Sequence, residues 1–144
     1  MSNENQIDWA RYNSLTSQKN SAETQMSEVQ SQTQQLNNQI KRLKSAKSIV
    51  ETEKENFKAI KKGISNIVDD DYEWKGDTYD KFKNYGSYLN EDHSNYYDSI
   101  DMVLDSINNK ITELENQIYR NDGILGELRS WWNSLCNSIE NLFN

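Results

Sequence analysis

Two long rows of apolar residues, spaced by alternating steps of three and four, constrain this chain more than any other feature. In the first row an apolar residue recurs at every seventh position, eight times in succession. Such a run is not expected by chance in a chain that is 34% hydrophobic, and it is typical of a helix that packs a narrow apolar stripe on another helix. We call these eight residues at seven-residue spacing the apolar row: Leu15, Ala22, Val29, Leu36, Leu43, Val50, Phe57 and Ile64.

A second row continues the same steps from Tyr79 to Leu142, with Leu89 and Tyr96 among its members and one slip near Tyr96. The sequence has no proline, so no residue of this kind interrupts either helix. Gly123 lies within the second row, and so does a second glycine three residues later; whether the helix bends or breaks there stays open, because each glycine costs about 1 kcal/mol against alanine.

The segment 69–77, with the sequence DDDYEWKGD, separates the two rows. Gly76 can adopt a positive φ that reverses the chain, and Asp77 is suited to cap the helix that follows. A short connection between two long helices makes them antiparallel neighbours. The sequence therefore predicts an all-α fold, a single domain formed by a long antiparallel two-helix hairpin with arms at about 6–68 and 78–142.

Charge and aromatic residues favour one pairing of the two arms, in which residue i faces about residue 145 − i. The segment 41–62 has eight Lys or Arg and three Glu, whereas its expected partner 83–104 has one Lys and four Asp or Glu. The same pairing places Trp9 level with Trp131 and Trp132, which predicts an aromatic cluster at the open end.

Composition excludes several classes of function. A net charge of −7 argues against binding to nucleic acid or anionic lipid, and a mean hydropathy of −1.02 with no long apolar run argues against stable membrane insertion. The polar first residues lack a secretory leader, so a cytoplasmic start is expected. Cys136 and His93 are the single residues of their kinds and lie far apart along a helix, so we expect no metal site, no cofactor and no enzyme.

Two helices alone bury only the strip between them, and several apolar side chains beside this strip are therefore expected to contact a partner. Lysines at four of the seven-residue positions next to the main row suggest that an acidic surface complements them. A homodimer and a complex with another helical protein are both compatible with this pattern. The candidate interface residues are Trp9, Ile49, Ile60, Ile67, Trp131 and Trp132.

The tripeptide Trp74-Lys75-Gly76, in the turn between matched helical arms, resembles the W-x-G superfamily of small helical proteins of type VII secretion. The indole is suited to cover the end of the seam, and the glycine permits the chain reversal. In length and architecture the chain is most similar to the YwqH-like family, helical proteins encoded beside LXG-domain toxins in Gram-positive bacteria. That motif covers only three residues, whereas the architecture covers nearly the whole chain.

The resemblance implies an adaptor or targeting factor that binds the helical LXG domain of a toxin, with a second small helical adaptor as a further partner, and that leaves the cytoplasm with its toxin through type VII secretion. The superfamily's export motif, Tyr-x-x-x-Asp/Glu, matches at Tyr88–Asp92 and at Tyr97–Asp101, although chance alone predicts about one such match. A self-associating coiled coil and a small directly secreted substrate remain as alternatives.

Overall fold

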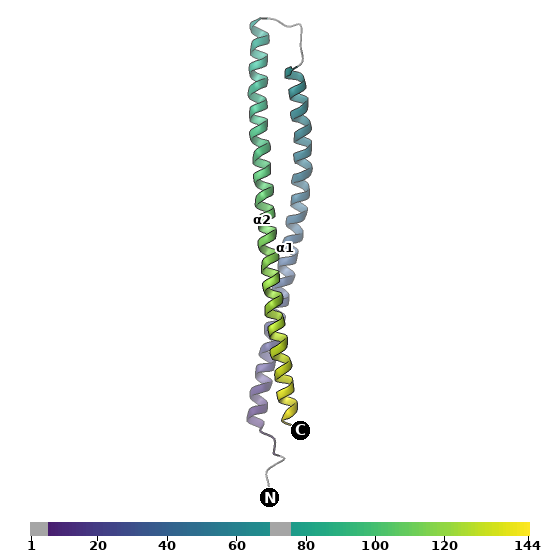
Figure 1. The fold of residues 1–144 in the computed structure, drawn as a ribbon, viewed down its shortest axis with the longest axis vertical. Helices are drawn as coiled ribbons and strands as arrows, with labels where there is room; N and C mark the ends of the chain where they lie inside the picture. Colours follow the sequence, from purple (N-terminus) through teal and green to yellow (C-terminus); the bar gives the residue numbers. More distant parts are fainter. Residues whose placement is uncertain (1–5, 70–75) are drawn as a thin grey trace. The chain divides into compact units, whose positions relative to one another are not determined.

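The computed structural model describes residues 6–69 and 76–144, and within them the chain forms two α-helices (Figure 1). Helix α1 spans Trp9–Asp69 and helix α2 spans Asp77–Asn141. The two helices pack on each other as an all-α helical hairpin, which confirms the predicted fold class. The predicted arms agree with the observed helices to within a few residues.

Two compact units are formed along the hairpin, and each contains a stretch of both helices. The first unit comprises Met1–Ile40 with Glu113–Asn144, and the second comprises Lys41–Thr112. In both units the contacts run in opposite directions along the two helices. Residues later in α1 contact residues earlier in α2, so the two helical stretches are antiparallel.

The seam of each unit follows the predicted seven-residue pattern on α1. All eight residues of the apolar row are buried or half-buried. The neighbouring row, which contains four lysines, also faces α2 and is equally removed from solvent. Helix α1 therefore packs on α2 along both rows, the apolar row and the neighbouring row that contains the lysines. This neighbouring row of α1 comprises Lys19, Met26, Thr33, Ile40, Lys47, Lys54 and Lys61.

The pairing predicted between the arms is wrong by about one heptad. It placed residue 88 opposite Phe57, whereas Phe57 contacts the rings of His93 and Tyr96. In the other unit it placed residue 122 opposite Glu23, whereas Glu23 accepts a hydrogen bond from the indole of Trp132. A periodic apolar seam is nearly as well satisfied after a slide of one heptad, so the spacing alone cannot define the register.

At the slip near Tyr96 in the apolar pattern of α2, the structure places more polar residues in the seam. Leu89 and Tyr96, both predicted seam members, are 52% and 58% exposed. His93 and Tyr97 occupy the seam in their place, and His93 is buried. An unbroken alternation of three- and four-residue steps back from Ile100 leads to Tyr97 and His93, so helical geometry selects these residues although they are less apolar.

The helix ends show one residue that sequence reasoning missed. Asp8 caps α1, since its side-chain oxygen accepts a hydrogen bond from the backbone N–H of Arg11 at 3.0 Å. At the start of α2 the capping position belongs to Gly76, one residue before the predicted Asp77. Its carbonyl accepts from the backbone N–H of Asp80 at 3.1 Å, and its φ of +100° confirms the predicted positive φ.

Helix α2 runs without interruption through Gly123 and Gly126, which settles the open question of a break. Both glycines lie on the exposed side of the helix, with nothing within 4 Å of the position that a Cβ would occupy. The helix therefore tolerates both glycines because its opposite side, which includes buried Leu128, stays packed.

Candidate partner-binding site

An open apolar groove of about 640 Å³ lies in the second unit, on one flank of the seam. Its lining combines seam residues with side chains that lie outside the seam and are exposed to solvent. Among the latter, Ile49 is 65% exposed, Tyr96 58% and Val103 48%. We call this feature the apolar groove; its lining comprises Ile49, Val50, Glu53, Phe57, Tyr96, Ser99, Ile100 and Val103.

Further exposed apolar side chains lie next to the apolar groove. Ile60, predicted as an interface residue, is 54% exposed and follows Glu53 by seven residues on the same face of α1. Met102, 70% exposed, lines a smaller pocket of about 330 Å³ together with Val103 and Leu43. Contiguous exposed apolar surface of this kind marks interaction sites on many proteins.

The opposite flank of the same unit carries charged side chains, and two of its lysines form ion pairs within the hairpin. Lys54 forms an ion pair with Asp101 and lies 5.1 Å from the ring centroid of Tyr97. The hydrogen bond to the Asp101 carboxylate raises the pKa of Lys54 above its usual value of 10.5. Lys47 lies 3.9 Å from Glu51 on its own helix. Lys54 and Lys47, two of the four lysines from which an acidic partner was predicted, thus have acidic partners within the chain.

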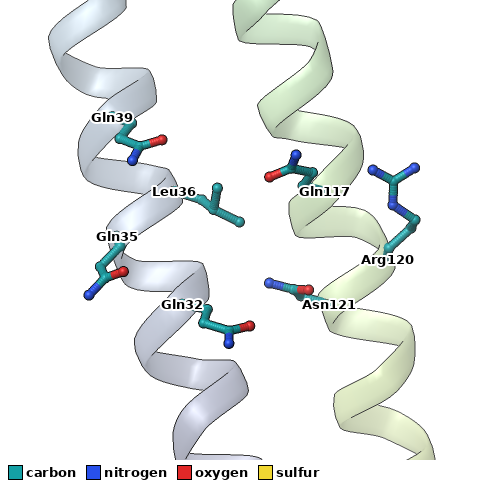
Figure 2. Close-up of a pocket in the computed structure, with 7 residues that line it drawn as sticks. All are labelled: Gln32, Gln35, Leu36, Gln39, Gln117, Arg120 and Asn121. Atoms are coloured by element: carbon teal, nitrogen blue, oxygen red, sulfur yellow. The ribbon is translucent and has the colours of Figure 1, made fainter.

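A polar groove of about 430 Å³ lies in the first unit and is lined mainly by amide side chains. Figure 2 shows Leu36 on α1 pointing toward α2, while Gln117 and Asn121 on α2 point toward α1. The amide of Asn121 donates a hydrogen bond to the hydroxyl of Thr33 at 3.3 Å, and this pair is partly buried. A polar pair inside an apolar seam favours one register over the alternatives, at some cost in stability.

The aromatic cluster of the first unit differs from the prediction. Trp9 and Tyr12 contact Phe143 edge to face, with ring centroids 6.5 and 5.6 Å apart. Trp132 lies outside this cluster, at an earlier position of α2, where the Lys19 ammonium is 5.5 Å from its ring centroid. Trp131 is 37% exposed. The one-heptad error in register explains why the cluster contains Phe143 rather than the two tryptophans.

The two candidate export motifs differ in accessibility. Tyr88 is 63% exposed and Asp92 is exposed, so this ring and carboxylate lie one turn apart on the surface. Tyr97 is half-buried under the Lys54 ammonium, and Asp101 is engaged by the same lysine. Of the two pairs, Tyr88–Asp92 is the one that another protein can reach without disturbing the seam.

Some of the predicted site residues have no structural description. Trp74 and the side chain of Ile67 lie outside the described part of the structure, and only Gly76 of the turn motif is described. Sequence reasoning also missed Glu53 and Asn121. Their positions at the edge of the groove and in the seam become informative only once the register is known.

No group of three or more His, Cys, Asp or Glu side chains in residues 6–69 and 76–144 is arranged to hold a metal ion. Neither helix, over its described length, has a stretch long and apolar enough to cross a membrane.

Fold and site together define an all-α helical hairpin whose second unit has two ion pairs on one flank and an open apolar groove on the other. The YwqH-like family model matches residues 17–141, which is most of the chain, so the chain belongs to the YwqH-like family. No curated protein and no solved structure matches it.

Proposed function

We propose that this protein is a non-enzymatic adaptor that binds the helical LXG domain of a type VII secretion toxin and promotes the toxin's export. The observation that carries the proposal is the apolar groove, which is exposed in a chain of the YwqH-like family. Helical proteins of this family are encoded beside LXG toxins, which supports such a toxin as the partner. A helical toxin domain can also present an apolar stripe that fits the groove.

In this proposal the chain acts by helix-on-helix packing. It covers apolar surface of the toxin's helical domain in the cytoplasm, alone or together with a second small helical adaptor, and leaves the cell with the toxin. The resemblance to W-x-G proteins through Trp74 and Gly76 supports a link to the type VII machinery. No chemical step is needed, and the groove residues act through burial of apolar area, at about 25 cal/mol per Å² removed from water.

Isolation of the tagged protein from its native host tests the proposal. Mass spectrometry identifies the bound proteins, and light scattering gives the stoichiometry of the eluted complex. Recovery of a toxin with an N-terminal LXG domain in a fixed ratio is the expected result. Recovery of the chain only with itself would instead favour a self-associating coiled coil.

A second candidate function is that of a small substrate secreted directly by the type VII machine. The exposed Tyr88–Asp92 pair favours it, because a recognition motif must be accessible on the folded hairpin. Export of the chain from a strain that lacks the toxin gene separates this candidate from the adaptor, which leaves the cell only with its toxin.

A further inference from the structure

The single charged residue that lines the apolar groove is Glu53. On the other flank of the unit, Lys54 has Asp101 and Lys47 has Glu51 as partners. Glu53 differs because no cation lies within reach along its own helix face. The residues one helical turn from Glu53 are Ile49, Val50, Asn56 and Phe57.

A helix that docks in the apolar groove covers Glu53 together with the apolar lining. A carboxylate that loses its water without gaining a cation is strongly destabilised, and this desolvation penalty would offset much of the gain from apolar burial. In the free hairpin the Glu53 carboxylate is exposed to solvent and unpaired. A molecule that covers the groove must therefore supply a positive charge that pairs with it. This requirement gives the groove a chemical preference that its apolar residues alone do not provide.

The same residue argues against a second copy of this chain as the occupant. In a twofold dimer the same surface meets itself. Glu53 lies in the middle of the α1 lining, between Val50 and Phe57, so a symmetric contact centred on the groove brings two carboxylates together. The net charge of −7 on each chain adds to this repulsion.

We propose that the apolar groove binds a helix of a different protein, whose apolar stripe at i, i+3, i+4 and i+7 carries one Lys or Arg that pairs with Glu53. Apolar side chains of this helix pack against Ile49, Tyr96 and Val103, and its cation forms a charge-assisted hydrogen bond with the carboxylate. The inference rests on the proposed function only for the identity of the partner, which is then the toxin's LXG domain.

Site-specific photo-crosslinking in the native host tests the occupant. The photoreactive amino acid p-benzoylphenylalanine replaces Val103 in the groove, or Asn108 on the opposite flank as a matched control. Both variants are checked for helix content and thermal unfolding before use. The crosslinked peptides are then mapped by mass spectrometry.

The expected result is an adduct from Val103 only, on a helical segment of another protein that carries Lys or Arg within one turn of the crosslink. An adduct on a second copy of this chain would overturn the inference. So would equal crosslinking from both positions, a captured segment without a cation, or no adduct from Val103.

Charge exchange tests the pairing itself on the captured partner. Glu53→Lys is expected to weaken binding roughly thirtyfold or more, and Glu53→Gln by less, because the first variant opposes two cations and the second leaves one unpaired. Glu55→Lys, an equal change of charge on the exposed surface nearby, is expected to leave binding unchanged. Replacing the partner's Lys or Arg by Glu is expected to restore binding to the Glu53→Lys variant.

The two proposals fail in different ways. Capture of a basic amphipathic helix from a protein that is not an LXG toxin contradicts the proposed function and supports this inference. An LXG toxin that binds equally well to wild type, Glu53→Lys and Glu55→Lys supports the proposed function and contradicts this inference.

Discussion

The imidazole of His93 stacks on the phenyl ring of Phe57, with 3.8 Å between the ring centroids and 11° between the ring planes. His93 is 6% exposed, and both of its ring nitrogens are buried without a hydrogen-bond partner among the described residues. The ring therefore supplies flat packing surface to the seam while its nitrogens lose their hydration.

Replacing His93 by phenylalanine is expected to raise the free energy of unfolding by about 1–3 kcal/mol. The substitution keeps a flat ring on Phe57 and removes two unsatisfied polar atoms. Guanidinium chloride unfolding followed by circular dichroism measures the change. Asn109→Phe, on the exposed face of α2, serves as the control and is expected to change stability by less than about 0.5 kcal/mol. A less stable His93→Phe variant would mean that the nitrogens have partners in solution.

The exposed glycines of α2 give a second prediction. Gly123→Ala and Gly126→Ala are each expected to stabilise the protein by about 1 kcal/mol, because the helix is continuous there and space for a Cβ is open at both positions. Gly76→Ala is the matched control. It also meets no neighbouring atom, but its φ of +100° is strained for alanine, so a loss of about 1 kcal/mol is expected. Thermal unfolding compares the three variants; equal effects at all three positions would contradict this account.

The fold class followed from the sequence because a helical hairpin needs little more than periodicity and a turn. Eight apolar residues at seven-residue spacing define one face of α1, and a glycine-containing polar segment ends the row. Each of these signals is local, so it can be recognised in the sequence without knowledge of the tertiary contacts. Gly76 was identified correctly for the same reason, since its positive φ is a property of the turn itself.

The register and the site were less accessible because both depend on contacts between the helices. A slide by one heptad preserves the apolar seam, so the observed pairs Phe57–His93 and Thr33–Asn121 could not be predicted from spacing. Exposed Ile49 and Ile60 were identified, because their positions beside the apolar row follow from α1 alone. Glu53 was missed because its isolation shows only once Lys54, the next residue, is seen paired on the opposite flank.

The ion pair between Lys54 and Asp101 predicts a pH dependence at alkaline pH. The pKa of Lys54 is raised by the hydrogen bond to Asp101, relative to 10.5 in the unfolded chain. A raised pKa means that the stabilisation is fully present below pH 10.5 and is lost as pH rises through the higher folded value. Asp101→Asn is therefore expected to be less stable than wild type at neutral pH, with a difference that shrinks above pH 10.5.

Urea unfolding across this range measures the difference at each pH. Asp105→Asn is the control, because it removes a carboxylate from an exposed position one turn further along α2. Its difference from wild type is expected to stay constant where that of Asp101→Asn shrinks. A difference for Asp101→Asn that does not depend on pH would show that the pair contributes nothing to folding in solution.

The exposure of Tyr88 predicts that only one of the two candidate export motifs acts in secretion. Tyr88→Ala is expected to reduce export of the chain and its toxin to background, with no change in thermal stability, because the ring is 63% exposed. Tyr97→Ala is expected to lower the unfolding temperature instead, since it removes a half-buried seam residue beneath the Lys54 ammonium. Immunoblots of culture medium and cells, with melting curves of the purified variants, separate the two effects.

Tyr85→Ala provides the matched control for this export measurement. Its ring is 71% exposed on the same helix, but the residue four positions later is Leu89, so it does not form the motif. Normal export of Tyr85→Ala together with loss in Tyr88→Ala and Asp92→Asn would assign recognition to the ring and carboxylate one turn apart. Equal export of all three variants would mean that the signal resides on the partner, and that this chain contributes only its groove.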